Sequence, residues 1–126
     1  MSGTSKFRSV SNHCIVIQPS PIHGKGVFAG TKLSAGQKIA YFEGYEIDHD
    51  TRYSLVLDGK RIEGTCNLRY INHSCAPNAH FRGRWLVVSR DIYHNEEITV
   101  DYLATENRIY HHFTCKCGAE NCRKRI

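Results

Sequence analysis

The sequence contains no long hydrophobic run. No apolar stretch approaches the roughly 18 residues that a helix needs to cross a bilayer. The opening segment, MSGTSKFRSVSN, is polar and lacks the apolar centre of a secretory signal. We therefore expect a soluble, unexported chain with no membrane partner, and the sequence leaves open whether it resides in the cytoplasm or the nucleus.

Sustained helical periodicity, internal repeats and low-complexity tracts are also missing. A length of 126 residues leaves room for one domain with a single core. Short apolar or β-branched runs separated by turn residues predict a mostly β fold. The predicted strands span residues 14–17, 26–29, 38–42, 53–57, 85–89 and 98–102, with turns at 34–36, 58–59 and 82–83 and a helical turn or two only within 104–113.

Acidic residues are absent from the first 40 positions, although the chain carries a formal net charge of +5. Residues 43–63 invert this pattern, because six acids there outnumber three basic residues. This segment would suit a cationic partner such as a basic peptide, and a solvated surface of mixed sign explains the same pattern. The acids are Glu43, Glu46, Asp48, Asp50, Asp58 and Glu63.

Six cysteines in a chain without a secretory segment favour metal binding or catalysis over a disulfide framework. Three of them lie within eight residues around a glycine, namely Cys115, Cys117 and Cys122. A structural zinc ion takes four tetrahedral ligands, so this cluster needs one more. The candidates are Cys75, His111, His112, Cys14 and Cys66. We favour Cys75 because the loop 72–78 can turn toward a metal, whereas Cys14 lies in an apolar predicted strand.

Two further patterns are weak in isolation. Gly24 and Gly26 flank one residue and would let the backbone approach a ligand, yet they equally fit a simple turn. No amphipathic helix follows them, which excludes a Rossmann dinucleotide-binding turn. Tyr102 ends the segment 96–102, and a tyrosine in such a position is more often a packed residue with a satisfied hydroxyl than a catalyst.

In combination and in order, these elements resemble a SET-domain protein lysine methyltransferase with a post-SET zinc segment. The motifs that carry the resemblance are His23–Ala29, Arg69–Asn78 with its Asn-His-Ser-Cys-x-Pro-Asn sequence, Glu96–Tyr102 and the cysteine tail. The resemblance covers residues 14–126 and implies a minimal, stand-alone SET protein. Its implied parts are a flexible tail over residues 1–12, a SET domain over 13–108 and a post-SET segment over 109–126.

The resemblance implies a β-rich fold of several small sheets with few short helices, in which the segment carrying Tyr102 threads beneath a loop as a pseudoknot. S-adenosylmethionine is the implied methyl donor, and Cys75 is the implied fourth ligand of one structural zinc ion. The post-SET segment would help to close the adenine pocket. The implied cofactor contacts are Gly24, Lys25, Gly26, Arg69, Tyr70, Asn72, His73 and Phe113.

The implied catalytic residue is Tyr102, whose hydroxyl would orient the substrate amine for in-line displacement. Tyr53 is the expected second wall of the lysine channel, and Tyr41 is a weaker candidate. Val100 stands where such proteins often carry Phe or Tyr, which predicts room for di- or trimethylation. The substrate-binding region 44–62 is very short, which predicts a reduced grip on the peptide.

We therefore expect an S-adenosylmethionine-dependent methyltransferase that acts on lysine side chains in a basic segment of a protein substrate. The alternative is a catalytically silent, zinc-stapled module of the same fold that binds a basic peptide or nucleic acid. Nucleic acid is the less favoured partner because no aromatic residues interleave the basic clusters. The sequence predicts no particular oligomeric state.

Overall fold

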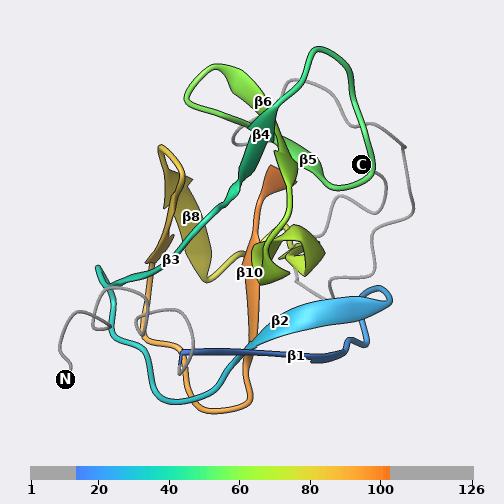
Figure 1. Ribbon diagram of the computed structural model, residues 1–126. Helices are drawn as coiled ribbons and strands as arrows, with labels where there is room; N and C mark the ends of the chain where they lie inside the picture. Colours follow the sequence, from blue (N-terminus) through green and yellow to red (C-terminus); the bar gives the residue numbers. More distant parts are fainter. Residues whose placement is uncertain (1–13, 103–126) are drawn as a thin grey trace, which may run out of the picture.

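The computed structural model describes residues 14–102, which form three small sheets joined by short connections (Figure 1). The strands are two to five residues long, a length that suits short runs between turn residues. One 3-10 helix, η2 (Asn67–Tyr70), connects two of the sheets. The strands are β1 (Ile15–Pro19), β2 (Lys25–Ala29), β3 (Lys38–Tyr41), β4 (Gly44–Glu46), β5 (Ser54–Leu57), β6 (Lys60–Gly64), β7 (Asn72–His73), β8 (Ala79–Arg82), β9 (Trp85–Val88) and β10 (Glu97–Val100).

The first sheet has the order β1-β2-β10-β7 and gathers segments from distant parts of the chain. β10 is an inner strand and pairs with β2 in antiparallel fashion along residues 97–98. On its other edge β10 runs parallel to β7, where residues 99–100 lie beside residues 72–73. The Gly-x-Gly segment, the Asn-His motif and the strand that leads to Tyr102 therefore meet in one sheet (Figure 1).

The other two sheets are antiparallel and have the orders β3-β9-β8 and β4-β6-β5. β5 and β6 are joined by a tight turn at Asp58-Gly59, where φ is 57° at the first residue and 78° at the second. Positive φ at both central residues defines the type I′ turn, which Asp-Gly favours and whose twist matches a two-residue hairpin. The turn that the sequence predicts at residues 58–59 is confirmed.

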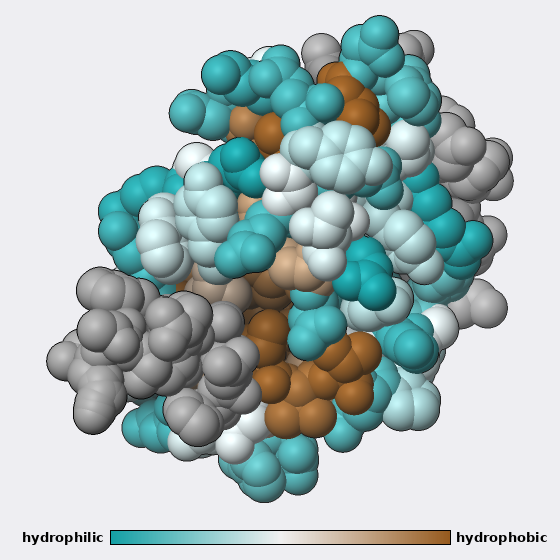
Figure 2. Space-filling view, viewed as in Figure 1, coloured by the Kyte–Doolittle hydropathy of each residue, from teal (hydrophilic) through white to brown (hydrophobic). Residues whose placement is uncertain are grey.

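The face of the molecule drawn in Figure 2 is mainly hydrophilic, with a few apolar areas. One of these areas lies where Figure 1 draws β1 and β2. Val16 on β1 is 45% exposed, whereas its neighbours Ile15 and Ile17 are half-buried, as expected when alternate residues of an edge strand face opposite sides. β1 thus turns one face to the core and one to the outside.

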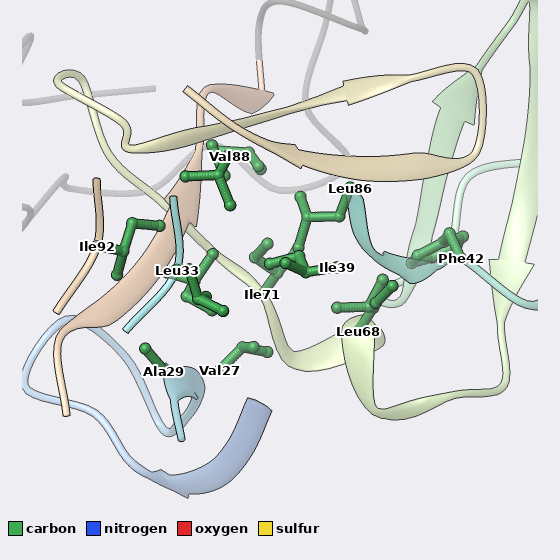
Figure 3. Close-up of a cluster of buried hydrophobic side chains, with 14 of the residues drawn as sticks. Val27, Ala29, Leu33, Ile39, Phe42, Leu68, Ile71, Leu86, Val88 and Ile92 are labelled. Atoms are coloured by element: carbon green, nitrogen blue, oxygen red, sulfur yellow. The ribbon is translucent and has the colours of Figure 1, made fainter. Parts of the chain in front are cut away.

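One hydrophobic core lies between the three sheets and η2 (Figure 3). Strands β2, β3, β9 and β10 each contribute consecutive or alternating buried side chains, and Leu68 adds one from η2. Its largest fully buried residues include Phe42, Leu33, Ile39, Leu86, Ile92 and Ile98. Close packing on this scale fixes β10, the strand that leads to the candidate site.

The predicted mostly β fold is confirmed, and each predicted strand matches an observed strand to within two residues at either end. Two expectations were wrong in detail. β10 ends at Val100 instead of reaching Tyr102, and Cys14 precedes β1 and is half-buried instead of lying inside the strand. The pattern does not predict β4, β6, β7 and β8, which are short or rich in polar residues.

The predicted helical turn at 104–113 and the domain boundaries at 12/13 and 108/109 lie outside the described residues. The threading of the chain beyond Tyr102 therefore stays a prediction. Within residues 14–102, no helix has the length and apolar character needed to span a membrane.

Candidate active site

Asn72 connects the Gly-x-Gly segment to β10 through the hydrogen bonds of its side chain. Its side-chain Nδ2 lies 3.1 Å from the carbonyl oxygen of His23, 3.1 Å from that of Lys25 and 2.9 Å from Glu97 Oε2. Gly24, between the two carbonyls, has φ of +43°, a conformation that costs glycine little. The Asn72 side chain is buried, so these hydrogen bonds fix the backbone that the sequence predicts to hold the cofactor.

Glu97 is a functional candidate that the sequence reasoning missed. Besides Asn72, its carboxylate accepts the Ser20 hydroxyl at 2.8 Å (Oε1) and 2.9 Å (Oε2). Together with the His23 and Lys25 carbonyls it forms an oxygen-rich corner that favours a cationic group. The available signal was its position: Glu97 is a charged residue that opens an otherwise buried strand and belongs to the Glu96–Tyr102 motif.

Gly26 allows the Glu97 and Ser20 side chains to lie close to the backbone. A Cβ added there would lie 2.3 Å from Glu97 Oε2 and 2.9 Å from Ser20 Cβ, so both side chains would have to move. We expect Gly26→Ala to lower the free energy of unfolding by about 1–3 kcal/mol, the usual cost of overpacking. Urea denaturation measures this loss.

The Glu97→Ala background provides the matched control for this prediction. With the carboxylate gone, the cost of Gly26→Ala should shrink by at least about 0.5 kcal/mol, as expected for residues in contact. Gly83→Ala serves as a second comparison, because its added Cβ meets nothing within 4 Å and its φ of +62° contributes backbone strain alone. A cost that is identical with and without the Glu97 carboxylate would contradict the clash.

His73 is a predicted cofactor contact, and the structure places its side chain inside the molecule. Its side chain is buried, with 2% of the residue exposed, and lies between Tyr102 and Cys75. Nδ1 accepts the backbone N–H of Tyr102 at 3.1 Å, and Nε2 lies 3.4 Å from Cys75 Sγ. Because both ring nitrogens are engaged, a cofactor contact at this residue would have to use its backbone.

Tyr102 follows β10 and is held at both ends. Its hydroxyl donates a hydrogen bond to the Ile71 carbonyl oxygen at 2.8 Å, and its ring centroid lies 5.3 Å from that of His73. Val100, two residues earlier, is 4% exposed and belongs to the core. The strand and the loop before β7 therefore determine jointly where the phenol oxygen lies.

The other predicted aromatic residue, Tyr53, joins a cluster around Tyr70. Their ring centroids are 5.8 Å apart with a T-shaped arrangement, a favourable geometry for aromatic pairs. Lys25 Nζ lies 5.3 Å from the Tyr70 ring centroid, and the Arg69 guanidinium lies 4.4 Å from it and donates to the Tyr70 hydroxyl at 2.7 Å. The structure thus brings together Lys25, Arg69 and Tyr70, three of the predicted cofactor contacts. Tyr41, the weaker candidate for the channel wall, packs against Trp85 on the β3-β9-β8 sheet, and their ring centroids are 5.1 Å apart.

Side chains from β6 hold the short region before Tyr53 in position. Arg61 pairs with Asp50 at 2.8 Å and donates to Ser54 Oγ at 3.0 Å. Thr51 donates its hydroxyl to the Glu63 carboxylate. Asp50 and Glu63, two acids of the segment 43–63, therefore interact with neighbouring residues of the fold. This leaves less negative charge for a basic ligand than the sequence alone suggests.

Of the predicted metal ligands, Cys75 is the one within the described residues, where it is buried. Residues 14–102 contain no cluster of three or more His, Cys, Asp or Glu side chains arranged to hold a metal.

The other candidate ligands are less suited or lie elsewhere. Burial raises the pKa of the Cys14 thiol and disfavours the thiolate that a metal needs. Cys66 accepts the Glu43 backbone N–H at 3.3 Å. Cys115, Cys117, Cys122, His111, His112 and the predicted adenine contact Phe113 lie outside the described residues.

The fold and these motifs agree with comparisons to known proteins. Residues 24–103 match the SET domain family, so the chain belongs to that family. Human "Histone-lysine N-methyltransferase 2B" is 29% identical over 145 residues, covering 94% of this chain and 5% of that protein. The Schizosaccharomyces pombe "Histone-lysine N-methyltransferase, H3 lysine-4 specific" is 44% identical over 63 residues, which is 44% of this chain and 7% of that protein.

A solved structure extends the likeness to three dimensions. The crystal structure of KRYPTONITE in complex with mCHG DNA and SAH superposes with a TM-score of 0.72 at 26% identity, covering 88% of this chain and 28% of that one. The chain thus has the fold of a SET domain and spans a small part of its curated relatives, 5% and 7% of the two named above. Those relatives are histone-lysine N-methyltransferases, which supports protein-lysine methyltransfer at the level of the family.

Proposed function

We propose that this chain transfers methyl groups from S-adenosylmethionine to lysine side chains of a protein substrate. The observation that carries the proposal is the position of Tyr102: its hydroxyl is bound to Ile71 and its backbone to His73, one strand away from the Gly-x-Gly segment that Asn72 fixes. The group proposed to orient the nucleophile and the loop proposed to bind the donor would thus both be attached to one sheet. Precise mutual placement of this kind is what a displacement reaction requires.

The residues around the Gly-x-Gly segment suit the proposed donor. S-adenosylmethionine supplies a methyl group activated by a sulfonium cation and carries an amino acid end with an ammonium group. The His23 and Lys25 carbonyl oxygens and the Glu97 carboxylate present acceptors on this side of the sheet, which favours positive charge. Gly24, Lys25 and Gly26 would contact this end through their backbone.

Tyr102 would act on the substrate amine as an acceptor. Because its own proton is donated to the Ile71 carbonyl, the phenol oxygen keeps lone pairs for an N–H of the incoming lysine. A free lysine, with a pKa of about 10.4, must lose a proton at a cost of roughly 4–5 kcal/mol at pH 7 before it can attack. Aromatic walls lower that cost, since desolvation disfavours the ammonium form, and Tyr53 is our candidate for the second wall.

We further propose that Cys75 binds one structural zinc ion together with Cys115, Cys117 and Cys122. A thiolate ligand is stabilised by an N–H donor, and Cys75 Sγ lies 3.4 Å from His73 Nε2. The metal would hold the C-terminal segment over the Asn72-His73 loop and with it the proposed adenine contact Phe113.

Incubation with labelled S-adenosylmethionine and a panel of basic proteins tests the proposed activity. Histone H3 peptides are the first choice, because one relative is named as specific for H3 lysine 4. We expect label on lysine, located by mass spectrometry. Tight binding of donor and peptide with no transfer would favour the catalytically silent module instead.

The same mass spectra test the proposed product range. Val100 offers a smaller side chain than the Phe or Tyr that the resemblance leads us to expect at its position, and we therefore propose room for more than one methyl group. We expect dimethyl and trimethyl lysine to accumulate on a good substrate at long times. Reactions that stop at monomethyl lysine under excess donor would contradict this part of the proposal.

A further inference from the structure

His73 bridges two residues that the proposed function assigns to different tasks. Its imidazole accepts the Tyr102 backbone N–H on Nδ1 and approaches Cys75 Sγ with Nε2, at 3.1 Å and 3.4 Å. Its side chain is 1% exposed, so water does not compete for these contacts. Since Cys75 is our proposed metal ligand and Tyr102 our proposed catalytic residue, the ring forms a direct physical link between the metal and the chemistry.

The hydrogen bonds determine which ring nitrogen carries the proton. A backbone N–H is an obligate donor, so Nδ1 must offer its lone pair to Tyr102. The proton of the neutral ring then sits on Nε2 and points to Cys75, whose sulfur is the acceptor. Asp101 Oδ1 also faces Nδ1, but at 3.6 Å it lies beyond the Tyr102 nitrogen and outside hydrogen-bonding distance.

We propose that His73 is a positioning residue that couples metal binding at Cys75 to the placement of Tyr102. An Nε2–H bond to sulfur supports a thiolate ligand and fixes the ring orientation, as donors behind metal ligands commonly do. The fixed ring in turn holds the Tyr102 backbone, and thereby the hydroxyl on Ile71. Loss of the metal would release the ring and let the phenol oxygen drift.

Two substitutions separate the two ends of this link. In His73→Asn, the amide oxygen occupies about the place of Nδ1 and can still accept the Tyr102 N–H, but the shorter side chain no longer donates to Cys75. In His73→Gln, the amide nitrogen occupies about the place of Nε2 and can still donate to Cys75, but the acceptor for Tyr102 is lost. Each variant thus serves as the control for the other.

We expect opposite losses in the two variants. His73→Asn should weaken zinc binding by about 10–100-fold in competition with a chromophoric chelator, and should keep Tyr102 amide protection when zinc is saturating. His73→Gln should bind zinc within about threefold of the wild type, and its Tyr102 amide should exchange faster with kcat reduced by about tenfold or more. Equal effects of both variants on both readouts, or no effect of either, would overturn the inference.

The wild-type chain allows the same test without substitution. Removing zinc with a chelator should speed hydrogen exchange at the Tyr102 amide while leaving the Thr99 amide protected, because Thr99 donates to Asn78 Oδ1 at 2.9 Å and not to His73. Unchanged exchange at Tyr102 would overturn the coupling even if both variants failed to fold. A wild-type chain that binds no zinc or transfers no methyl group would instead refute the proposed function on which this inference rests.

Discussion

Tyr102→Phe is expected to lower the rate of methyl transfer by about 100-fold or more while leaving donor binding nearly unchanged. The substitution removes the oxygen that would orient the lysine nitrogen, and it keeps the ring that packs near His73. Misplacement of a reacting group by about 1 Å can cost about 100-fold. Single-turnover kinetics with labelled donor, combined with calorimetric titration of S-adenosylhomocysteine, would separate the two effects.

Tyr93→Phe is the matched control, because the same oxygen is removed from a residue that is 58% exposed and lies outside the site. It should retain full activity. The Ile71 carbonyl loses its donor in Tyr102→Phe, so thermal unfolding should show a loss of about 1–3 kcal/mol at most. Activity of Tyr102→Phe within a few-fold of the wild type would rule out the proposed role of the hydroxyl.

Cys75→Ala is expected to abolish stoichiometric zinc binding and, with it, donor binding. Even residues behind metal ligands cost about 10–100-fold in affinity when changed, so loss of a ligand itself should cost more than about 100-fold. Metal binding also orders the chain that carries the ligands. Without the metal, the C-terminal segment should no longer be held in its proposed position over the Asn72-His73 loop. Elemental analysis of purified protein and donor titration measure both losses.

Cys14→Ala provides the control for the cysteine substitution. Burial raises the pKa of the Cys14 thiol, which keeps it protonated at neutral pH and makes it a poor ligand. This variant should therefore bind zinc as the wild type does. Full activity of the wild-type chain after verified removal of zinc would contradict the proposed dependence of donor binding on the metal.

The sequence was sufficient to predict the parts of the fold that depend on local pattern. β-branched runs bounded by turn residues located β1 and β2, and Asp58-Gly59 identified a hairpin turn by its chemistry. The order of motifs identified the SET domain, to which the family match assigns residues 24–103. The strands and the turn are marked by a few consecutive residues, and the family is marked by several such short runs in a fixed order.

The remaining features depend on contacts between distant segments. β7 has only two residues and exists because β10 runs beside it, so nothing in its own sequence marks a strand. Glu97 belongs to the site through Ser20 and Asn72, which lie 77 and 25 positions away in the chain. Likewise, the spacing of the Asn-His motif could not tell that the His73 side chain would turn toward Tyr102 and Cys75.

A crystal structure of the full chain with S-adenosylhomocysteine, zinc and a lysine-containing H3 peptide tests the central claim most directly. We predict that the spent donor lies against Gly24–Gly26 and that its sulfur faces the lysine nitrogen. The Tyr102 hydroxyl oxygen should lie within hydrogen-bonding distance of that nitrogen, and zinc should bind Cys75 with the three C-terminal cysteines. A donor bound elsewhere, or a Tyr102 hydroxyl turned away from the lysine, would contradict the account.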